Sequence, residues 1–187
     1  MFTGIVQAVG CIERLDPLQI ATGRLPLAGM RIGDSICVQG CCLTVIRKAR
    51  RRLWFDVSKE TLRVTAGLDR PGQVNLEKSL GLGDPLGGHL VTGHVDGVGR
   101  VTAKKGSEYT FEAPKGLARY IARKGSVCVD GVSLTVNRVT GSRFEVNLIP
   151  HTLKVTTLGR LGRGTKVNLE VDLLARYLDR LRNRVIE

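Results

Sequence analysis

The stretch Ile36–Val45, ICVQGCCLTV, decides the fold because the chain contains it twice. The second copy is VCVDGVSLTV at Val127–Val136, 91 positions later, with its Cys, Gly, Leu and Thr in register. That separation is far longer than the period of solenoid repeats, which is about 20 to 50 residues. The sequence therefore predicts two copies of a whole small domain.

Three further blocks repeat in the same order. They are TGIV and TGHV at residues 3–6 and 92–95, ETL and HTL at 60–62 and 151–153, and VNLE at 74–77 and 167–170. Because the order of blocks is kept, we expect residues 1–86 and 87–171 to form two equivalent domains. The Gly-rich stretch Gly81–Gly88 is the natural linker, although Gly87-Gly88-His89 could also be a tight functional turn.

The repeated stretch has the pattern of a strand with two faces. Leu43 and Val45 alternate with Cys42 and Thr44, the period of two that is typical of a half-buried strand. About six short strands at roughly 8 to 12 residue spacing fit each half, which favours a small closed antiparallel sheet. Aromatic residues make up only 4% of the chain, so the cores must consist of Val, Leu and Ile. We predict an all-β protein of two compact barrels.

Two segments predict helices. In the segment Pro114–Lys124, Leu117, Tyr120 and Ile121 lie on one side of a predicted helix, which ends at Gly125. Because the two halves are repeats, we expect one short helix in each.

Residues 172–187 form the second helical segment, which Asp172 can cap. Its narrow apolar stripe consists of Leu174, Leu178, Leu181 and Val185. Such a helix is marginal alone in water, so it should pack either on a barrel or against identical helices of other subunits.

Composition excludes several classes of protein. No apolar run approaches the ~18 residues of a membrane span, and the first residues lack the pattern of a signal peptide, so we expect a cytoplasmic protein. The five cysteines have no metal-ligand spacing, so we expect free thiols and no metal. The net charge of +12 would suit a nucleic-acid partner, but the basic residues are scattered, so we expect neither nucleic acid nor a membrane as a partner. The densest basic run, Arg47–Arg52, is better explained as a solvated hairpin turn.

The chemistry must come from small polar groups, because no nucleotide-binding loop, zinc-protease motif or nucleophile elbow occurs. Matching positions of the two halves carry such groups beside a glycine: Cys42 and Ser133, Thr44 and Thr135, Thr61 and Thr152, with Gly4 and Gly93. Hydroxyls beside exposed backbone amides can read the edge of a flat heterocycle, and two sets imply two similar ligands. Alternatively, these residues only line strand faces and bulges.

The motifs together resemble one family. MFTGIV, GCCLTV, KETLR, GGHLVTGHVDG, KGSVCVDGVSLTV and LIPHTL followed by TTLG are similar, in order and over nearly the whole chain, to the riboflavin synthases of the alpha-chain type. The resemblance implies two six-stranded Greek-key barrels plus the C-terminal helix, assembled as a homotrimer. It implies dismutation of two 6,7-dimethyl-8-ribityllumazine molecules to riboflavin and 5-amino-6-ribitylamino-uracil, with no cofactor, between barrels of adjacent subunits. Association with lumazine synthase is a further possible partnership.

The resemblance also assigns site residues. The first site would be built from Gly4, Ile5, Val6, Cys42, Leu43, Thr44, Asp56, Val57, Ser58, Lys59, Glu60 and Thr61. The second would be built from Gly93, His94, Val95, Lys124, Ser133, Leu134, Thr135, Asn147, Leu148, Ile149, Pro150, His151 and Thr152.

Five residues are assigned to the chemistry. Phe2 and Cys42 would lie beside the reacting carbons, and Cys42 would polarise the ring or add to it transiently. Ser133 with Asp130 would be the counterpart of Cys42 in the other barrel. His94 would carry the proton, because histidine titrates near neutral pH, unless it is a structural histidine. For Cys42 as a nucleophile, the sequence offers no basic partner that would lower the thiol pKa.

One departure and two alternatives remain. Gln39 stands where the resemblance leads us to expect Asn, so a hydrogen bond near the site is repositioned. A lumazine- or flavin-binding relative without catalysis is the first alternative, against which the presence of Phe2, Cys42, His94 and Ser133 argues. A basic β-barrel that binds RNA is the second, supported only by charge.

Overall fold

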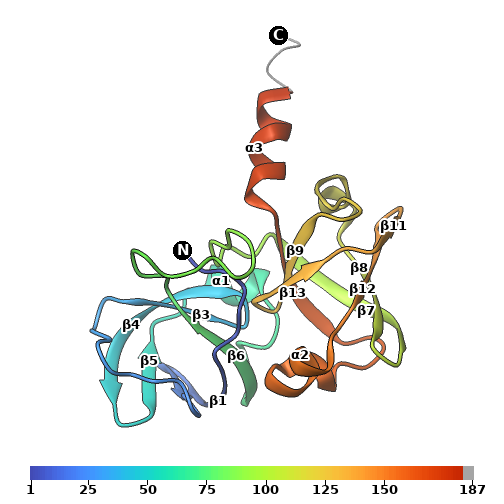
Figure 1. Ribbon diagram of the computed structural model, residues 1–187. Coiled ribbons are helices and arrows are strands. Elements are labelled where there is room, and N and C mark those ends of the chain that lie inside the picture. The colour runs from blue at the N-terminus through green and yellow to red at the C-terminus, as the bar shows by residue number, and fades with distance from the viewer. Residues whose placement is uncertain (183–187) are drawn as a thin grey trace.

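The first half of the chain is a closed barrel of six antiparallel strands (Figure 1). The computed structural model describes residues 1–182. The strands lie in the order β1-β2-β5-β4-β3-β6, and β6 pairs with β1 to close the barrel. Their bounds are β1 Ala8–Leu15, β2 Leu18–Ala21, β3 Ser35–Val38, β4 Cys41–Ala49, β5 Arg52–Phe55 and β6 Gly72–Lys78.

The second half repeats this order with seven strands. The sheet runs β10-β9-β13-β7-β8-β12-β11, in which β13, β7, β8 and β12 correspond to β6, β1, β2 and β5. The counterpart of β4 is divided at Val136 and Asn137 into β10 and β11, so seven strands fill six barrel positions. The bounds are β7 Gly97–Lys105, β8 Glu108–Glu112, β9 Ser126–Val129, β10 Val132–Thr135, β11 Arg138–Thr140, β12 Arg143–Asn147 and β13 Lys166–Val171. The predicted fold of two β-barrels and a C-terminal helix is confirmed.

The short helices differ from the prediction. The predicted helix Pro114–Lys124 is only the 3₁₀ helix η1, Lys115–Tyr120, because Ile121 leaves the helical backbone to become buried. Each half instead has a six-residue α-helix after its fifth barrel strand. These helices are α1 Lys59–Val64 and α2 Pro150–Val155, the latter followed by the 3₁₀ helix η2, Thr157–Arg160.

Each barrel has a core of its own. Aliphatic side chains fill both, as the composition predicts, and the second adds Tyr109, Phe111 and Phe144, whose rings stack. A third, smaller cluster lies between the barrels and contains Phe2, Cys37, Val91 and Cys128. The barrels therefore pack on each other through buried side chains.

Two hairpin turns meet at the seam between the barrels. Gln39-Gly40 and Asp130-Gly131 all have positive φ, as a two-residue type I′ turn requires. A Cβ on Gly40 would lie 2.9 Å from the Gly131 backbone nitrogen, so the two turns touch backbone to backbone.

Two asparagines cross the same seam in opposite directions. Asn75 Nδ2 donates to the Asp130 carbonyl and Asn168 Nδ2 donates to the Gln39 carbonyl, each at 2.8 Å. Because each contact has its mirror in the other half, the barrels are related by an approximate two-fold axis through this seam.

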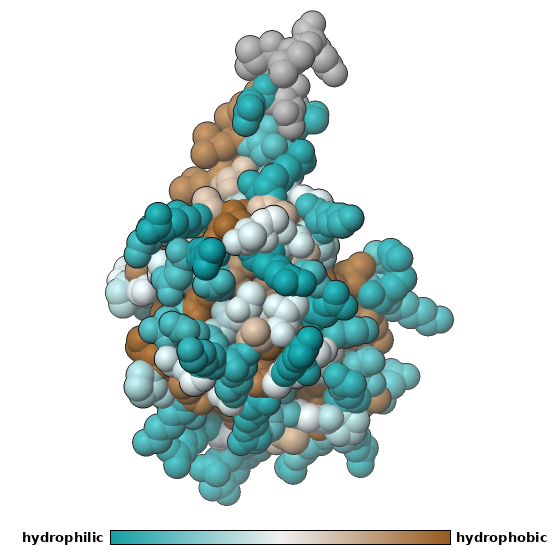
Figure 2. Space-filling model, turned by 90° about the vertical axis from the view of Figure 1, so that its right-hand side faces the viewer, coloured by the Kyte–Doolittle hydropathy of each residue, from teal (hydrophilic) through white to brown (hydrophobic). Residues whose placement is uncertain are grey.

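The C-terminal helix α3, Leu173–Arg182, projects away from both barrels (Figure 1). Asp172 Oδ1 accepts a hydrogen bond from the Leu174 N–H at 2.9 Å, which supports its predicted capping role. Leu174, Leu178 and Leu181 are all exposed, and Figure 2 shows hydrophobic residues along one side of the helix. Val185, the last residue of the predicted stripe, lies outside the described residues. Among residues 1–182, no helix combines the length and apolar character needed to cross a bilayer.

Candidate functional site

Two arms of the chain are exchanged between the barrels. The arms are residues 2–6 and 91–95, and they pair through hydrogen bonds between the Phe2 and Val91 backbones, at 2.7 and 3.1 Å. Each arm precedes the first strand of its own barrel but crosses to the opposite barrel.

The first arm lies on the second barrel. The Gly4 carbonyl accepts a hydrogen bond from the Ser133 N–H at 2.8 Å, and Val6 packs against the core of that barrel. The second arm mirrors this on the first barrel, where the Gly93 carbonyl accepts from the Cys42 N–H, also at 2.8 Å.

The predicted grouping of the site residues is therefore wrong. The sequence assigned residues 4–6 to the face of residues 42–44, whereas the structure places them beside residues 133–135. Residues 93–95 lie beside residues 42–44 instead. The repeat could not show this exchange, because an arm satisfies the same local pattern on either barrel.

Each arm contains a glycine at a position where there is no space for a side chain. Gly93 has φ +78, and a Cβ there would lie 2.6 Å from Cys42 Cβ. Gly4 has φ +76 and would place its Cβ 2.6 Å from Ser133 Cβ. The backbone of an arm can approach the neighbouring strand this closely only where the residue has no Cβ. Close packing therefore explains why the glycine of the Thr-Gly pair occurs in both arms.

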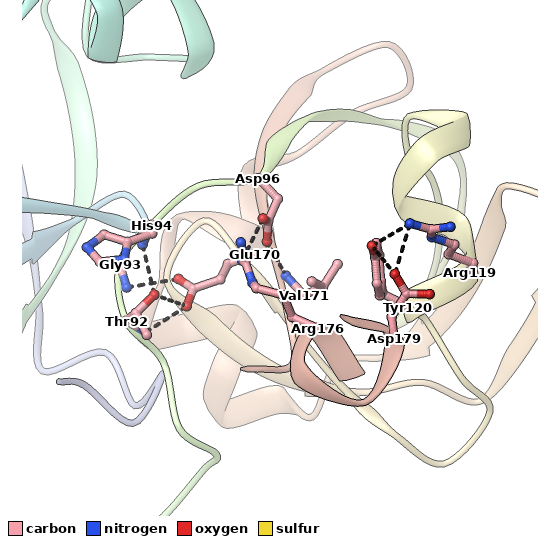
Figure 3. Close-up of polar contacts among 10 residues, drawn as sticks. All are labelled: Thr92, Gly93, His94, Asp96, Arg119, Tyr120, Glu170, Val171, Arg176 and Asp179. Atoms are coloured by element: carbon pink, nitrogen blue, oxygen red, sulfur yellow. Dashed lines mark hydrogen bonds and ion pairs between the residues drawn. The ribbon is translucent and has the colours of Figure 1, made fainter. Parts of the chain in front are cut away.

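Buried glutamates hold the two arms. Glu170 on β13 accepts hydrogen bonds from the Thr92 N–H at 2.6 Å, from Thr92 Oγ1 at 2.7 Å and from the Gly93 N–H at 2.9 Å (Figure 3). Burial raises the pKa of the Glu170 carboxyl, and these hydrogen bonds partly oppose that shift. Glu77 on β6 holds Thr3 and Gly4 in the same way. The sequence signal for these two glutamates is the block VNLE, which is identical in both halves.

The repeated strands present their polar side chains outward. Cys42 is half-buried and Thr44 is exposed, whereas Leu43 is buried in the core, as the alternating pattern predicts. Ser133, Thr135 and Leu134 follow the same arrangement in the second half. The side chains of Leu43 and Leu134 are therefore turned away from the outer face, where only their backbone groups are accessible to a ligand.

The segments after the fifth strands lie beside these faces. Residues 56–61 follow Phe55, which pairs with Val45 next to Thr44. Most of their side chains are exposed, and Ser58 Oγ caps α1 by accepting from the Thr61 N–H at 3.0 Å. Residues 147–152 occupy the corresponding place in the second half; Leu148 is buried, whereas Asn147, Ile149, Pro150 and His151 are exposed.

Lys124 lies next to the second face in a strained backbone conformation. Its N–H donates to the Val136 carbonyl at 2.7 Å, and its φ is +67. The equivalent position in the first half is Gly33, with φ +95. A left-handed conformation costs a non-glycine residue about 1 to 2 kcal/mol, so Lys124 carries a strain that a glycine in its place would not have.

We expect Lys124→Gly to increase the free energy of unfolding by up to about 1 kcal/mol, because glycine relieves the strain but loses more chain entropy on folding. Urea unfolding of both proteins measures the gain. The reverse change in the first half, Gly33→Lys, should destabilise, since φ is positive there too. A loss of stability in Lys124→Gly would contradict the strain argument.

A second histidine, which the sequence analysis did not assign, contacts Ser133. His89 Nδ1 and Ser133 Oγ are hydrogen-bonded at 2.7 Å, and His89 is 8% exposed. Burial lowers the pKa of His89, and its Nε2 has no hydrogen-bond partner among residues 1–182. His94, the predicted proton carrier, is exposed on its arm and points away from Asp96 and α3 in Figure 3. The available sequence signal for His89 is the Gly87-Gly88-His89 turn.

The remaining residues assigned to chemistry lie in different surroundings. Phe2 is fully buried in the cluster between the barrels and supports Cys42 from behind. Asp130 is 2% exposed in its seam turn, where Oδ1 accepts from the Asn168 N–H at 2.8 Å.

The thiols differ in reactivity because they differ in burial. All five cysteines are free. Burial raises the pKa of Cys41 to about 12 and those of Cys37 and Cys128 well above the usual value, so these three thiols stay protonated. Cys42 is therefore the half-buried thiol that faces an arm. The described residues contain no cluster of three or more His, Cys, Asp or Glu side chains placed to bind a metal.

Comparison with known proteins gives the same family for both halves. A family model described as lumazine binding domain matches residues 3–79 and 92–172. Proteins named riboflavin synthase from Brucella abortus (strain 2308) and Mycobacterium tuberculosis (strain ATCC 25618 / H37Rv) are 44% and 45% identical to this chain. Each alignment covers 97% of this chain and 98% of the relative.

Solved structures show the same architecture. The crystal structure of LumP complexed with riboflavin has a TM-score of 0.81 and 28% identity, covering 91% of this chain and 99% of that chain. LumP complexed with 6,7-dimethyl-8-(1'-D-ribityl) lumazine has a TM-score of 0.77 and 26% identity, with the same coverage. With two lumazine-binding repeats and relatives matched over nearly their whole length, this chain belongs to the riboflavin synthase family and is an enzyme of that type.

Proposed function

We propose that the protein converts two molecules of 6,7-dimethyl-8-ribityllumazine into riboflavin and 5-amino-6-ribitylamino-uracil by transfer of a four-carbon unit. The observation that carries this proposal is the duplicated arrangement of a glycine arm over a polar strand face, at Gly93 with Cys42 and at Gly4 with Ser133. Two equivalent faces suit two identical ligands. The LumP structures, which hold a lumazine or riboflavin on the same fold, support the class of ligand.

The two faces would each bind one lumazine. The first face consists of residues 42–44, 56–61 and 93–95, and the second of residues 4–6, 124, 133–135 and 147–152. Exposed apolar side chains border the faces, with Leu62 in α1 and Ile149 before α2. These side chains would cover a flat ring, while the strand hydroxyls and arm amides would bind its polar edge.

Positioning would supply most of the rate. The methyl group on the electron-poor lumazine ring is acidic, because its anion delocalises into the heterocycle. The protein then needs to hold two rings in opposed orientation, and such positioning can contribute about 7 to 11 kcal/mol of the barrier.

Proton transfer would use different groups on the two faces. On the second face, neutral His89 would accept a proton through Ser133, because its lowered pKa leaves the imidazole unprotonated near neutral pH. On the first face, Cys42 would add to the ring or polarise it. His94 borders that face from the arm.

The reacting pair would form between subunits. Thr44 and Thr135 are exposed in the single chain, so both faces need a cover. We propose that the cover is a second copy of this chain, joined in a trimer through the exposed stripe of Leu174, Leu178 and Leu181. The spacing of this stripe is that of a helix seam between identical helices.

Two matched variants test both the reaction and its location. Thr44→Arg and Thr135→Arg each place a long cation on one face at an exposed strand position, so folding should be nearly unaffected. We expect the wild-type protein to convert the lumazine to riboflavin, followed by absorbance, and each variant to lose activity at least about 100-fold.

Co-expression of the two variants decides where the site lies. If a site combines the first face of one subunit with the second face of another, each mixed trimer contains one intact site of three. Random assembly of equal amounts of the two variants should then restore about a quarter of the wild-type activity. No recovery, with mixed trimers shown by mass, would contradict a site between subunits.

The second candidate function is ligand binding without catalysis, which the fold shared with LumP favours. Tight binding of the lumazine by the wild-type protein, with no riboflavin formed, would establish it. The higher identity to the synthases, 44–45% compared with 26–28%, favours the enzyme.

A further inference from the structure

Asp96 joins the second arm to the C-terminal helix. Its N–H donates to the Leu169 carbonyl at 2.8 Å, and its Oδ2 accepts from the Val171 N–H at 2.8 Å. Its Oδ1 accepts from Arg176 Nη2 in α3 at 2.6 Å (Figure 3). The Asp96 side chain is 10% exposed and that of Arg176 is 43% exposed, so this ion pair is much better shielded from water than a fully exposed surface pair.

The first half shows what Asp96 adds. Its counterpart is Gln7, whose N–H donates to the Leu76 carbonyl at 2.9 Å and whose Oε1 accepts from the Lys78 N–H at 3.0 Å. Both residues thus make the same two contacts to the last barrel strand. Only the second half is followed by a helix, α3. There the neutral amide of Gln7 is replaced by the carboxylate of Asp96, whose second oxygen binds Arg176 of α3.

Polar contacts fix the direction of α3, because none of its described residues is buried. Besides the pair with Asp96, Asp179 Oδ2 accepts from Tyr120 Oη at 2.9 Å and lies 2.9 Å from Arg119 Nη2 (Figure 3). Arg176 contacts Asp96, the residue that follows the arm, whereas Asp179 contacts η1. The orientation of the helix thus depends on two side-chain attachments about one turn apart.

The arm bound by Asp96 carries residues of the first face. Glu170, one residue before Val171, holds the Thr92 and Gly93 amides, and the Gly93 carbonyl meets the Cys42 N–H. A continuous set of contacts therefore runs from Arg176 through Asp96 and the end of β13 to Cys42.

We propose that Arg176 is a positioning residue that fixes, through Asp96, both the arm against Cys42 and the direction of the C-terminal helix. Assembly of subunits and formation of the first face then both depend on the ion pair between Arg176 and Asp96. The effect on turnover rests on the function proposed above, whereas the effect on the arm does not.

The test compares Arg176→Met and Asp96→Asn in the full chain. Asp96→Asn keeps an oxygen for the Val171 N–H and removes the charge, as in Gln7. Both variants should increase amide hydrogen exchange at Thr92 and Gly93 by about tenfold, because the arm opens more often. They should lower kcat by about tenfold with little change in KM, because the ring is bound but misplaced.

Three further variants make the result specific. Arg180→Met removes the same charge one turn later in α3 and should leave exchange at Thr92 and Gly93 unchanged. Arg176→Lys, which keeps the charge, should restore part of kcat. The double variant Arg176→Met with Asp96→Asn should be no worse than either single change, because both remove one interaction.

The proposal is overturned if exchange at Thr92 and Gly93 in Arg176→Met equals that of the wild type, even if activity or the subunit mass in solution falls. It is also overturned if the two single effects add in the double variant. If the wild-type protein forms no riboflavin, the proposed function fails, while the exchange measurement still decides whether Arg176 positions the arm.

Discussion

Replacing Gly93 with alanine is expected to destabilise the fold by about 2 to 5 kcal/mol and to abolish turnover. The new Cβ would lie 2.6 Å from Cys42 Cβ and 2.8 Å from the Cys42 backbone nitrogen, so backbone must move. The positive φ adds a strain of about 1 to 2 kcal/mol, and overpacking costs about 1 to 3 kcal/mol or more. The arm would have to leave the strand, which removes one wall of the first face.

The control separates the clash from the strain. Gly29 has φ +76, close to that of Gly93, but a Cβ there meets no atom within 4 Å. Gly29→Ala should therefore cost only about 1 to 2 kcal/mol and keep full activity. Urea unfolding and the riboflavin assay on both variants measure the difference. Equal losses at the two positions would refute the close approach of the arm to Cys42.

Replacing Asp130 with asparagine is expected to stabilise the protein above neutral pH while leaving turnover intact. Burial raises the pKa of Asp130 from 3.8 to about 7, and the hydrogen bond from the Asn168 N–H only partly opposes this shift. The folded protein thus keeps the proton up to about pH 7, whereas the unfolded chain loses it above pH 3.8. Stability from this group is present below pH 4 and is lost as the pH rises to 7.

A shift of this size corresponds to about 4 kcal/mol, at about 1.4 kcal/mol for each pH unit. Asparagine keeps an oxygen for the Asn168 N–H and has no charge, so Asp130→Asn should gain up to about this amount at pH 8 and nothing at pH 4. Unfolding free energies in urea between pH 4 and 8 give the difference curve. Asp69→Asn makes the same substitution at an exposed position and is the control.

The same variant tests the catalytic role assigned to Asp130 by resemblance. Its burial in the seam turn predicts a structural role, so kcat should stay within about twofold of the wild type. A loss of activity without a change in stability would restore Asp130 to the chemistry.

The repeat and its alternating pattern were sufficient to predict the two barrels, because inward Leu43 and Val45 and outward Cys42 and Thr44 specify a strand and its two faces. The exchange of the arms could not be predicted. It depends on a contact between Gly4 and Ser133 that no local pattern encodes, since the two barrels offer the arm nearly the same surface.

Other parts of the site lacked a periodic signal. Helices α1 and α2 have six residues each and bury none of them, so no stripe marks them in the sequence. His89 has no repeated partner, and its importance depends on a hydrogen bond to a residue 44 positions away. The departure at Gln39 proved interpretable: its Oε1 accepts from the Asn75 N–H at 2.9 Å, as Asp130 Oδ1 does from Asn168.

The seam contacts also determine when the two halves can associate during synthesis on the ribosome. Asn168 donates to the carbonyl of Gln39 across 129 positions of the chain, so the first barrel receives that bond only when almost the whole polypeptide has emerged. Closing so long a loop is slow compared with forming a hairpin. A nascent chain that has completed its amino-terminal half must therefore wait for most of the second half before the Gln39 carbonyl receives this donor.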